Sequence, residues 1–271
     1  MNRITLRLII IMALVLIAVP DADARKKKGK EQEVAVLEPD KAPNLYKAMP
    51  DSHPRSLNQP HFSISATQGQ TGIQGIDVSH YQGRINWSEV AKDKKVGYVY
   101  LKATEGRDNV DDTYAYNVQE ARRNGLKVGA YHFFRPNIPA ADQFRNFTRV
   151  VDRKTQDLKP IIDVEVTGGV SIATMNARLE ELLQMIAREY GTKPIIYTGR
   201  NFYNKYIAAD SRLRNYQFMI AQYTDDEPIL TNGDDYVMWQ FTSHGTIRGI
   251  RGSVDQSRMH GRHSLSEILY K

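Results

Sequence analysis

The segment PIIDVEV, residues 160–166, decides how this sequence is interpreted. It is apolar and β-branched after a proline, which is typical of a strand inside a globular protein. Yet it carries two acids, Asp163 and Glu165, and an unpaired charge is very costly in a protein core. Because side chains of a strand alternate between its two faces, both acids share one face and the intervening apolar residues take the other. We therefore predict a strand with one face packed under helices and one face available for chemistry.

On both sides of this segment the sequence alternates strand-like and helix-like patterns from Gly72 onward. Ser171 is suited to cap the start of a helix, and Gly125 and Gly191 stand where helices should end. Strand-then-helix units repeated five times predict a parallel sheet. The five pairs are GIDVSH with WSEVAKDK, VGYVYLKAT with TYAYNVQEARRNG, KVGAYHFF with AADQFRNFTRVVDRK, PIIDVEV with SIATMNARLEELLQMIAREYG, and PIIYTG with NFYNKYIAA.

After residue 210 the pattern changes, because the strand-like segments FMIAQY, YVMWQF and SVDQS are joined by connections without a helical period. Eight strands with about five helices indicate an α/β fold, an irregular TIM-like (β/α) barrel, in preference to an open doubly wound sheet. No glycine-rich phosphate loop follows any strand, so nucleotide binding is not indicated.

Residues 1–24 have the three parts of a secretory signal peptide: basic Arg3 and Arg7, an apolar run over residues 8–19, and a small-residue site at 22–24. An uncleaved membrane anchor is the alternative, but this run is shorter than the roughly 20 residues that cross a bilayer. The basic residues 25–28 work against translocation. We expect cleavage after Ala24 and export to the periplasm or the extracellular space.

Residues 25–72 mix charge runs and prolines with almost no apolar period, so we expect a disordered linker. They hold 8 basic and 5 acidic residues, whereas residues 73–271 hold 27 and 24. Residues 73–271 are long enough for one sizeable core, and their balanced charge does not favour nucleic-acid binding. The chain has no cysteine, which excludes disulfides and thiolate metal sites.

Further acids and aromatic residues fall at strand ends. Asp77 lies in GIDVSH and Asp255 in GSVDQS, and the first and last strands of a closed barrel are neighbours. Parallel-barrel enzymes place their chemistry at the carboxyl ends of their strands. Aromatic faces stack on sugar rings, and two carboxyls divide acid and charge-stabilising roles. The composition is that of a sugar-cleaving cleft, with Glu105, Tyr131, His132, Tyr197, Gln222, Tyr223, Trp239 and Gln240 around the acids.

Each of these residues taken alone has a simpler interpretation. A single acidic residue in a strand is usually a cap or a salt-bridge partner, and Glu105 could be an acidic residue in a turn. His132 beside two phenylalanines could be a core histidine, and Trp239 and Tyr197 could serve packing. The coincidence of four acids at strand ends favours a site.

Seven motifs in order and spacing resemble the glycoside hydrolase family 25 lysozymes across residues 73–271. They are GIDVSHYQGRINW, YLKATEG, GAYHFF, PIIDVEV, IIYTG, MIAQY and VMWQF. The resemblance implies an irregular barrel of eight strands and five helices that cleaves the β-1,4 bond between N-acetylmuramic acid and N-acetylglucosamine in peptidoglycan, with retention. It implies that Glu165 is the general acid. Asp163 would be the nucleophile, or would orient the N-acetyl group of the substrate. Asp77 and Asp255 would adjust the protonation of Asp163 and Glu165 and would stabilise positive charge on the sugar.

We expect a monomer that contacts peptidoglycan glycan strands, without a nucleic-acid partner, a stable membrane span after cleavage, a metal ion or a cofactor. One departure from the family pattern is Ser257, which stands in VDQS where V-D-x-N is frequent. The expected substrate contacts are Tyr81, Glu105, His132, Tyr197, Gln222 and Trp239.

Other functions stay open at this point. A peptidoglycan-binding protein without turnover would keep the aromatic groove, and a divalent-metal hydrolase would use the clustered carboxyls as ligands. The Cα atoms of Asp163 and Glu165 should lie roughly 6.5–7 Å apart along a strand. That spacing does not fix the distance between their carboxyl groups, so it does not distinguish retaining from inverting geometry.

Overall fold

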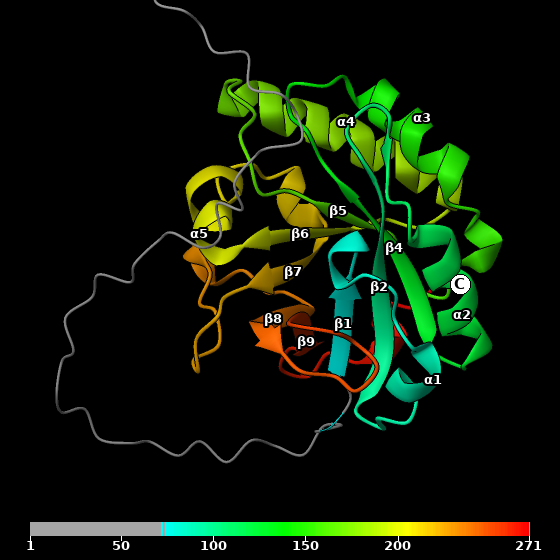
Figure 1. Ribbon diagram of the computed structural model, residues 1–271. Helices are drawn as coiled ribbons and strands as arrows, with labels where there is room; N and C mark the ends of the chain where they lie inside the picture. Colours follow the sequence, from blue (N-terminus) through cyan, green and yellow to red (C-terminus); the bar gives the residue numbers. More distant parts are fainter. Residues whose placement is uncertain (1–71, 73, 271) are drawn as a thin grey trace, which may run out of the picture. The chain divides into compact units, whose positions relative to one another are not determined.

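The structure, a computed structural model, describes Gly72 and residues 74–270 (Figure 1). The predicted signal peptide and all of the predicted linker except Gly72 lie outside the described residues.

Eight strands form a closed barrel in the order β1-β9-β8-β7-β6-β5-β4-β2, and β1 pairs with β2 to complete the ring. The two-residue strand β3, Asn109–Val110, pairs only with the end of β2. The barrel strands are β1 Gln74–Val78, β2 Val96–Glu105, β4 Lys127–Phe133, β5 Ile161–Asp163, β6 Ile195–Gly199, β7 Gln217–Ala221, β8 Met238–Gly245 and β9 Val254–Met259. The predicted α/β barrel is confirmed.

The prediction of parallel strands holds from β1 to β8, but β9 runs antiparallel to both of its neighbours, β8 and β1. The physical reason is the connection between β8 and β9. A parallel return requires a crossover of a dozen or more residues, usually a helix, whereas an antiparallel return needs only a short loop. Residues 246–253 provide such a loop.

Helices cover the outside of the barrel, and α3 packs beside α4 (Figure 1). Ser171 caps α4 by accepting a hydrogen bond from the backbone N–H of Thr174, and Gly191 follows it with a φ of 68°. The helices are α1 Trp87–Val90, α2 Tyr114–Arg123, α3 Ala140–Val150, α4 Ile172–Tyr190 and α5 Arg200–Phe202, which continues into a π turn at Tyr203–Ile207. Short 3-10 turns lie at His80–Gln82, Arg153–Thr155, Leu213–Asn215, Thr231–Gly233 and Leu265–Glu267.

The apolar residues form two layers, one inside the barrel and one between the barrel and its helices. On β5 the alternation is direct, because Ile161 belongs to the inner layer and Ile162 to the outer one. Burial of an aliphatic side chain of this size contributes roughly 1.5–3 kcal/mol. The predicted division of PIIDVEV into an inward and an outward face is therefore confirmed for this strand.

Two tyrosines fill the barrel interior beside glycines that make room for them. A Cβ atom on Gly75 would lie 1.9 Å from the ring of Tyr98, and one on Gly129 would lie 2.5 Å from the ring of Tyr100. Both tyrosines are fully buried. The interior is thus a packed core, and space for a substrate is limited to the barrel mouth at the carboxyl ends of the parallel strands.

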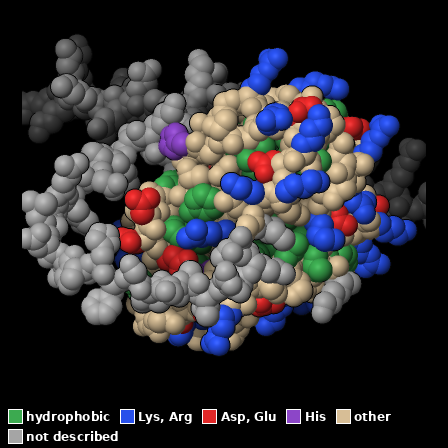
Figure 2. All heavy atoms as spheres, turned by 90° about the horizontal axis from the view of Figure 1, so that it is seen from below, with side chains coloured by type: hydrophobic (Ala, Val, Ile, Leu, Met, Phe, Trp, Pro, Cys, Tyr) green, Lys and Arg blue, Asp and Glu red, His purple; other side chains and the backbone are tan. Residues whose placement is uncertain are grey.

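The face shown in Figure 2 carries Lys and Arg side chains spread across it with Asp and Glu among them. Among the described residues, no helix combines the length and the apolar character needed to span a bilayer.

Candidate active site

Asp77 and Asp255 are paired directly across the antiparallel strands β1 and β9. Their carboxyl groups are close enough for each to shift the pKa of the other. Burial, followed by the charge of Asp255, raises the pKa of Asp77 well above its ordinary value. Burial also raises the pKa of Asp255 to about 6, although its contact with Asp77 and the charge of His244 oppose the rise. Both shifts favour protonation, so this pair holds a proton more readily than an isolated carboxyl does.

Gln240 on β8 holds this pair in place. Its Nε2 donates to Asp77 Oδ1 at 2.8 Å, and its Oε1 accepts from the hydroxyls of Tyr197 and Tyr223, each at 2.8 Å. Gln240 is fully buried. Sequence reasoning placed Gln240 and Tyr223 at strand ends but did not include them among the expected contacts. The signal was available, because alternation on β8 turns Gln240 inward when Trp239 faces outward.

Asp163 ends β5 and is buried at the barrel mouth, beside Phe133 on β4 and Tyr197 on β6. Its Oδ1 has no hydrogen-bond partner among the described residues. Burial, and then the charge of Glu165, raise the pKa of Asp163 well above its ordinary value, whereas the charge of Lys102 opposes this rise.

Glu165 follows β5 by two residues and is partly exposed. Its charge acts on Asp163, on Asp77 and on the hydroxyl of Tyr223. The structure thus brings all four predicted acids into one electrostatically coupled group at the mouth.

Glu105 forms ion pairs with two cations. Its Oε2 accepts from Lys102 Nζ at 2.7 Å, and its Oε1 accepts from Arg135 Nε at 2.9 Å. Burial alone would raise the pKa of Glu105, but its hydrogen bonds and the charges of Lys102 and Arg135 hold the pKa below its ordinary value. Glu105 was predicted as a substrate contact. In the structure its carboxylate positions Lys102, which acts on Asp163.

His132 was also predicted as a substrate contact, and this prediction is wrong. The side chain is fully buried on the outer side of β4. Its Nδ1 is 2.7 Å from Thr104 Oγ1 and its Nε2 is 3.0 Å from Gln143 Oε1 on α3, so neither ring nitrogen is open to a ligand. Burial lowers the pKa of His132 to about 4, which keeps the ring neutral. Strand alternation turns Tyr131 and Phe133 inward and His132 toward the helix.

The remaining predicted contacts occupy different places. Tyr81 is 79% exposed on the turn after β1, beside the ring of His80. Gln222 donates to Thr224 Oγ1 and to a backbone carbonyl within the loop after β7. Trp239 is buried on the outer side of β8 and donates from Nε1 to the backbone oxygen of Gln222 at 2.9 Å. Gln222 and Trp239 therefore brace the loop that carries Tyr223.

Ser257, the departure from the family pattern, lies inside the barrel. Its hydroxyl is 3.1 Å from the Tyr98 hydroxyl, and both side chains are buried. A longer amide side chain at this position would need the space that the Tyr98 hydroxyl occupies. The serine is therefore matched to the tyrosine beneath it.

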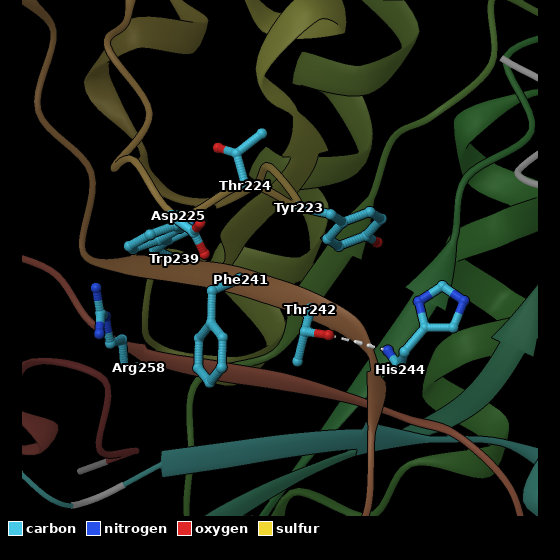
Figure 3. A pocket seen from close by; sticks show the side chains of 8 residues that line it. All are labelled: Tyr223, Thr224, Asp225, Trp239, Phe241, Thr242, His244 and Arg258. Carbon is cyan, nitrogen blue, oxygen red and sulfur yellow. Dashed lines mark hydrogen bonds between the residues drawn. The ribbon is translucent and has the colours of Figure 1, made fainter. Parts of the chain in front are cut away.

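A hollow of about 420 Å³ lies beside β8 and β9 (Figure 3). Trp239, Phe241, Thr242 and His244 of β8 form its floor. Residues 223–225 and Arg258 of β9 complete its lining. Tyr223 belongs both to this hollow and to the hydrogen-bonded group around Gln240. Among the described residues, no three His, Asp or Glu side chains are arranged to hold a metal ion.

Comparison with known proteins identifies the family. Residues 76–250 match the family described as glycosyl hydrolases family 25. The chain belongs to this family. The resemblance noted from the seven motifs is therefore confirmed, and the family 25 domain contains Asp77, Asp163 and Glu165.

Similar family 25 proteins include curated relatives and solved structures. The chain is 37% identical over 204 residues to the uncharacterized protein YegX of Escherichia coli K12, covering 74% of each chain. It is 30% identical over 203 residues to Lysozyme M1 of Streptomyces globisporus, covering 70% of this chain and 69% of that one. The structure is similar to a bacterial lysozyme from Streptomyces coelicolor, with a TM-score of 0.66 and 28% identity over 74% of this chain and 96% of that chain. A family 25 glycosyl hydrolase from Bacillus anthracis gives a TM-score of 0.65 and 28% identity, over 79% and 97% of the two chains.

Proposed function

We propose that this family 25 protein is an exported lysozyme, a 1,4-β-N-acetylmuramidase that hydrolyses the bond between N-acetylmuramic acid and N-acetylglucosamine in peptidoglycan. The observation that carries the proposal is the coupling of Asp77, Asp163, Glu165 and Asp255 in one group at the barrel mouth. Crowded carboxyls cannot all ionise, so some of them hold protons near neutral pH while others stay charged. The names of the relatives Lysozyme M1 and Autolytic lysozyme support the same activity.

In the proposed reaction the proton that Asp163 and Glu165 compete for lies on Glu165 when the glycan is bound. Glu165 gives this proton to the glycosidic oxygen as the bond from that oxygen to the sugar C1 breaks. The positive charge that develops at C1 is met by an oxygen of the Asp163 carboxylate, or by the N-acetyl oxygen of the substrate held by Asp163. Glu165, now ionised, takes a proton from water, and the water oxygen bonds to C1. It displaces the oxygen of Asp163, or of the N-acetyl group, that had bonded to C1. Two displacements at C1 give retention.

Asp77 and Asp255 have a supporting role in this proposal. The proton on Asp77 lets it donate to Asp255, which leaves one negative charge on the pair to steady the positive sugar. Gln240 fixes Asp77 from the other side, and Tyr197 and Tyr223 hold the Gln240 amide in the orientation that donates. Groups positioned before the reaction stabilise developing charge without reorganising at the transition state.

The test is release of reducing ends from purified peptidoglycan by the protein and by its Glu165→Gln variant. The variant should release none while unfolding at the same temperature, because the amide keeps the shape but has no acidic proton. Mass spectrometry of the wild-type fragments should find muramic acid at the reducing ends. Undiminished release by the variant would reject Glu165 as the acid. Wall binding by the wild type without new reducing ends would indicate a binding protein.

Export is a separate part of the proposal and rests on residues 1–24 of the sequence. Amino-terminal sequencing of the protein recovered from expressing cells should give Arg25 as the first residue. Recovery of the full-length chain in the membrane fraction would instead support the uncleaved anchor.

A further inference from the structure

Tyr223 links the hollow beside β8 to the acid group. Tyr223 lines the hollow and donates to Gln240, which in turn donates to Asp77. His244 lines the same hollow and acts electrostatically on Asp255. Tyr223 and His244 are therefore the lining residues through which the hollow is connected to the acid group.

The far end of the hollow is charged. Arg258 pairs with Trp239 across β8 and β9, and its guanidinium lies 4.5 Å from the centre of the Trp239 ring. Its Nη2 is 3.5 Å from Glu227, and both side chains are about half exposed, so this ion pair is open to exchange. Asp225 also lines the hollow, and within the described part of the chain its carboxylate has no hydrogen-bond or ion-pair partner. Figure 3 shows Arg258 and Asp225 toward one end, with Tyr223 and His244 toward the other.

These charges fit one part of peptidoglycan better than another. The sugar backbone is uncharged, because its lactyl carboxyl is joined to peptide, whereas the stem peptide carries carboxylates and the amine of a diamino acid. A guanidinium binds carboxylates through paired N–H donors, and a carboxylate accepts from an ammonium group. Arg258 is thus suited to a stem-peptide carboxylate and Asp225 to its amine.

The length of β8 along the hollow also fits an extended stem peptide. Trp239 and His244 are five residues apart on β8, which spans roughly 16 Å at the usual rise of a strand. An extended peptide of about five residues covers that distance. A stem peptide attached to the muramic acid at the acids would reach Arg258 by lying along β8.

We propose that the hollow lined by Tyr223, Asp225, Phe241, His244 and Arg258 binds the charged stem peptide of the sugar that is being cleaved. The proposal rests on the muramidase function and deepens it. Peptide recognition in this hollow would make the protein prefer glycan strands that still carry their peptides over stripped strands.

The test compares two substrates, peptidoglycan strands with intact stem peptides and the same strands after an amidase has removed the peptides. The amidase leaves a lactyl carboxylate on each muramic acid, so the stripped strands lack the peptide but keep one charge near the acids. Arg258→Gln should lower kcat/KM on intact strands about three- to tenfold, and it should leave the value on stripped strands within about twofold. Added salt should shrink the difference, because a half-exposed charge pair is screened. Arg145→Gln on α3 is the matched control. Arg145 also pairs with a carboxylate, that of Asp142, but lies outside the hollow, and its substitution should change neither value.

Direct binding provides a second readout that does not depend on turnover. The stem tetrapeptide L-alanyl-γ-D-glutamyl-diaminopimelyl-D-alanine should bind the Glu165→Gln variant in calorimetry, and adding Arg258→Gln or Asp225→Asn should weaken it. Equal losses of kcat/KM on both substrates would overturn the proposal in favour of a sugar-binding role. Unchanged kcat/KM together with no tetrapeptide binding would also overturn it. Absence of wild-type activity on both substrates would instead reject the muramidase function itself.

Discussion

Asp77 on β1 and Asp255 on β9 face each other directly across two antiparallel strands. Opposed side chains on such strands have Cβ atoms only about 4.5–5.5 Å apart, so their carboxyls meet. Oδ2 of Asp77 is buried and has no hydrogen-bond partner among the described residues. The raised pKa values of both carboxyls favour a proton on the pair, so its charge changes with pH.

The first prediction concerns stability of Asp255→Asn. A carboxyl whose pKa is raised by folding, here to about 6, favours the folded state at low pH and disfavours it once it ionises. The amide removes that ionisation and supplies an N–H for Asp77 Oδ2. The free energy of unfolding of the variant should exceed that of the wild type by about 2–3 kcal/mol at pH 7.5, or about 5–10 °C in Tm. At pH 4 the two proteins should differ little. Thermal unfolding at the two pH values measures this, and an equal gain at both would contradict the shared proton.

The second prediction concerns Gln240→Met, which keeps the volume but removes the hydrogen bonds to Asp77, Tyr197 and Tyr223. Loss of a preorganised donor should lower kcat on peptidoglycan about 10- to 100-fold. Steady-state kinetics should show the loss mainly in kcat, because Gln240 is buried and acts through Asp77. Tyr223→Phe is the milder comparison, since Gln240 keeps its bond to Tyr197. A loss confined to KM would show that Gln240 contacts the substrate instead.

The third prediction concerns the pH profile of Lys102→Met. The charge of Lys102 opposes the rise in the pKa of Asp163, so its removal should raise that pKa further. If Asp163 must be ionised to act, the acid limb of the kcat profile should move to higher pH. Activity should then fall more at pH 5 than at pH 8. Lys102→Arg keeps the charge and should preserve the profile. An unshifted limb in the methionine variant would remove Lys102 from the proposed mechanism.

The fourth prediction concerns His132→Leu and tests the corrected placement of this residue. The variant leaves Thr104 and Gln143 without their buried partner, so it should lose about 2–4 kcal/mol of stability. Its kcat/KM should stay within about twofold of the wild type. Urea unfolding and turnover on peptidoglycan measure the two quantities. A large loss of turnover in the folded variant would restore His132 to the site.

The same residue predicts a pH effect on stability. The pKa of His132 falls on folding to about 4, so the neutral ring stabilises the fold above pH 6.5 and this contribution is lost as the pH falls toward 4. The loss should approach about 3 kcal/mol. The leucine variant should lack this component of acid sensitivity, which separates it from the opposite effect of Asp255.

Much of the fold could be predicted because it depends on local periods. The alternation in PIIDVEV placed Ile161 and Asp163 on the inner face, and Ser171 and Gly191 marked the ends of α4. The same rule, applied to strand β4, would have turned His132 outward. That error came from grouping residues by their position near a strand end without following the alternation through each strand.

The sequence by itself determined the barrel, the inward face of each strand and the presence of acids at the strand ends, because strand alternation and helix period follow from the covalent geometry of neighbouring residues. Only the tertiary structure decided that Asp77 meets Asp255, that Gln240 donates to Asp77, that Glu105 is occupied by Lys102 and Arg135, and that Arg258 borders a hollow beside the acids. Except for Lys102 with Glu105, these pairings join residues far apart in the chain. They depend on barrel closure, on the register between strands and on which side chains fill the remaining space, and no local pattern encodes them.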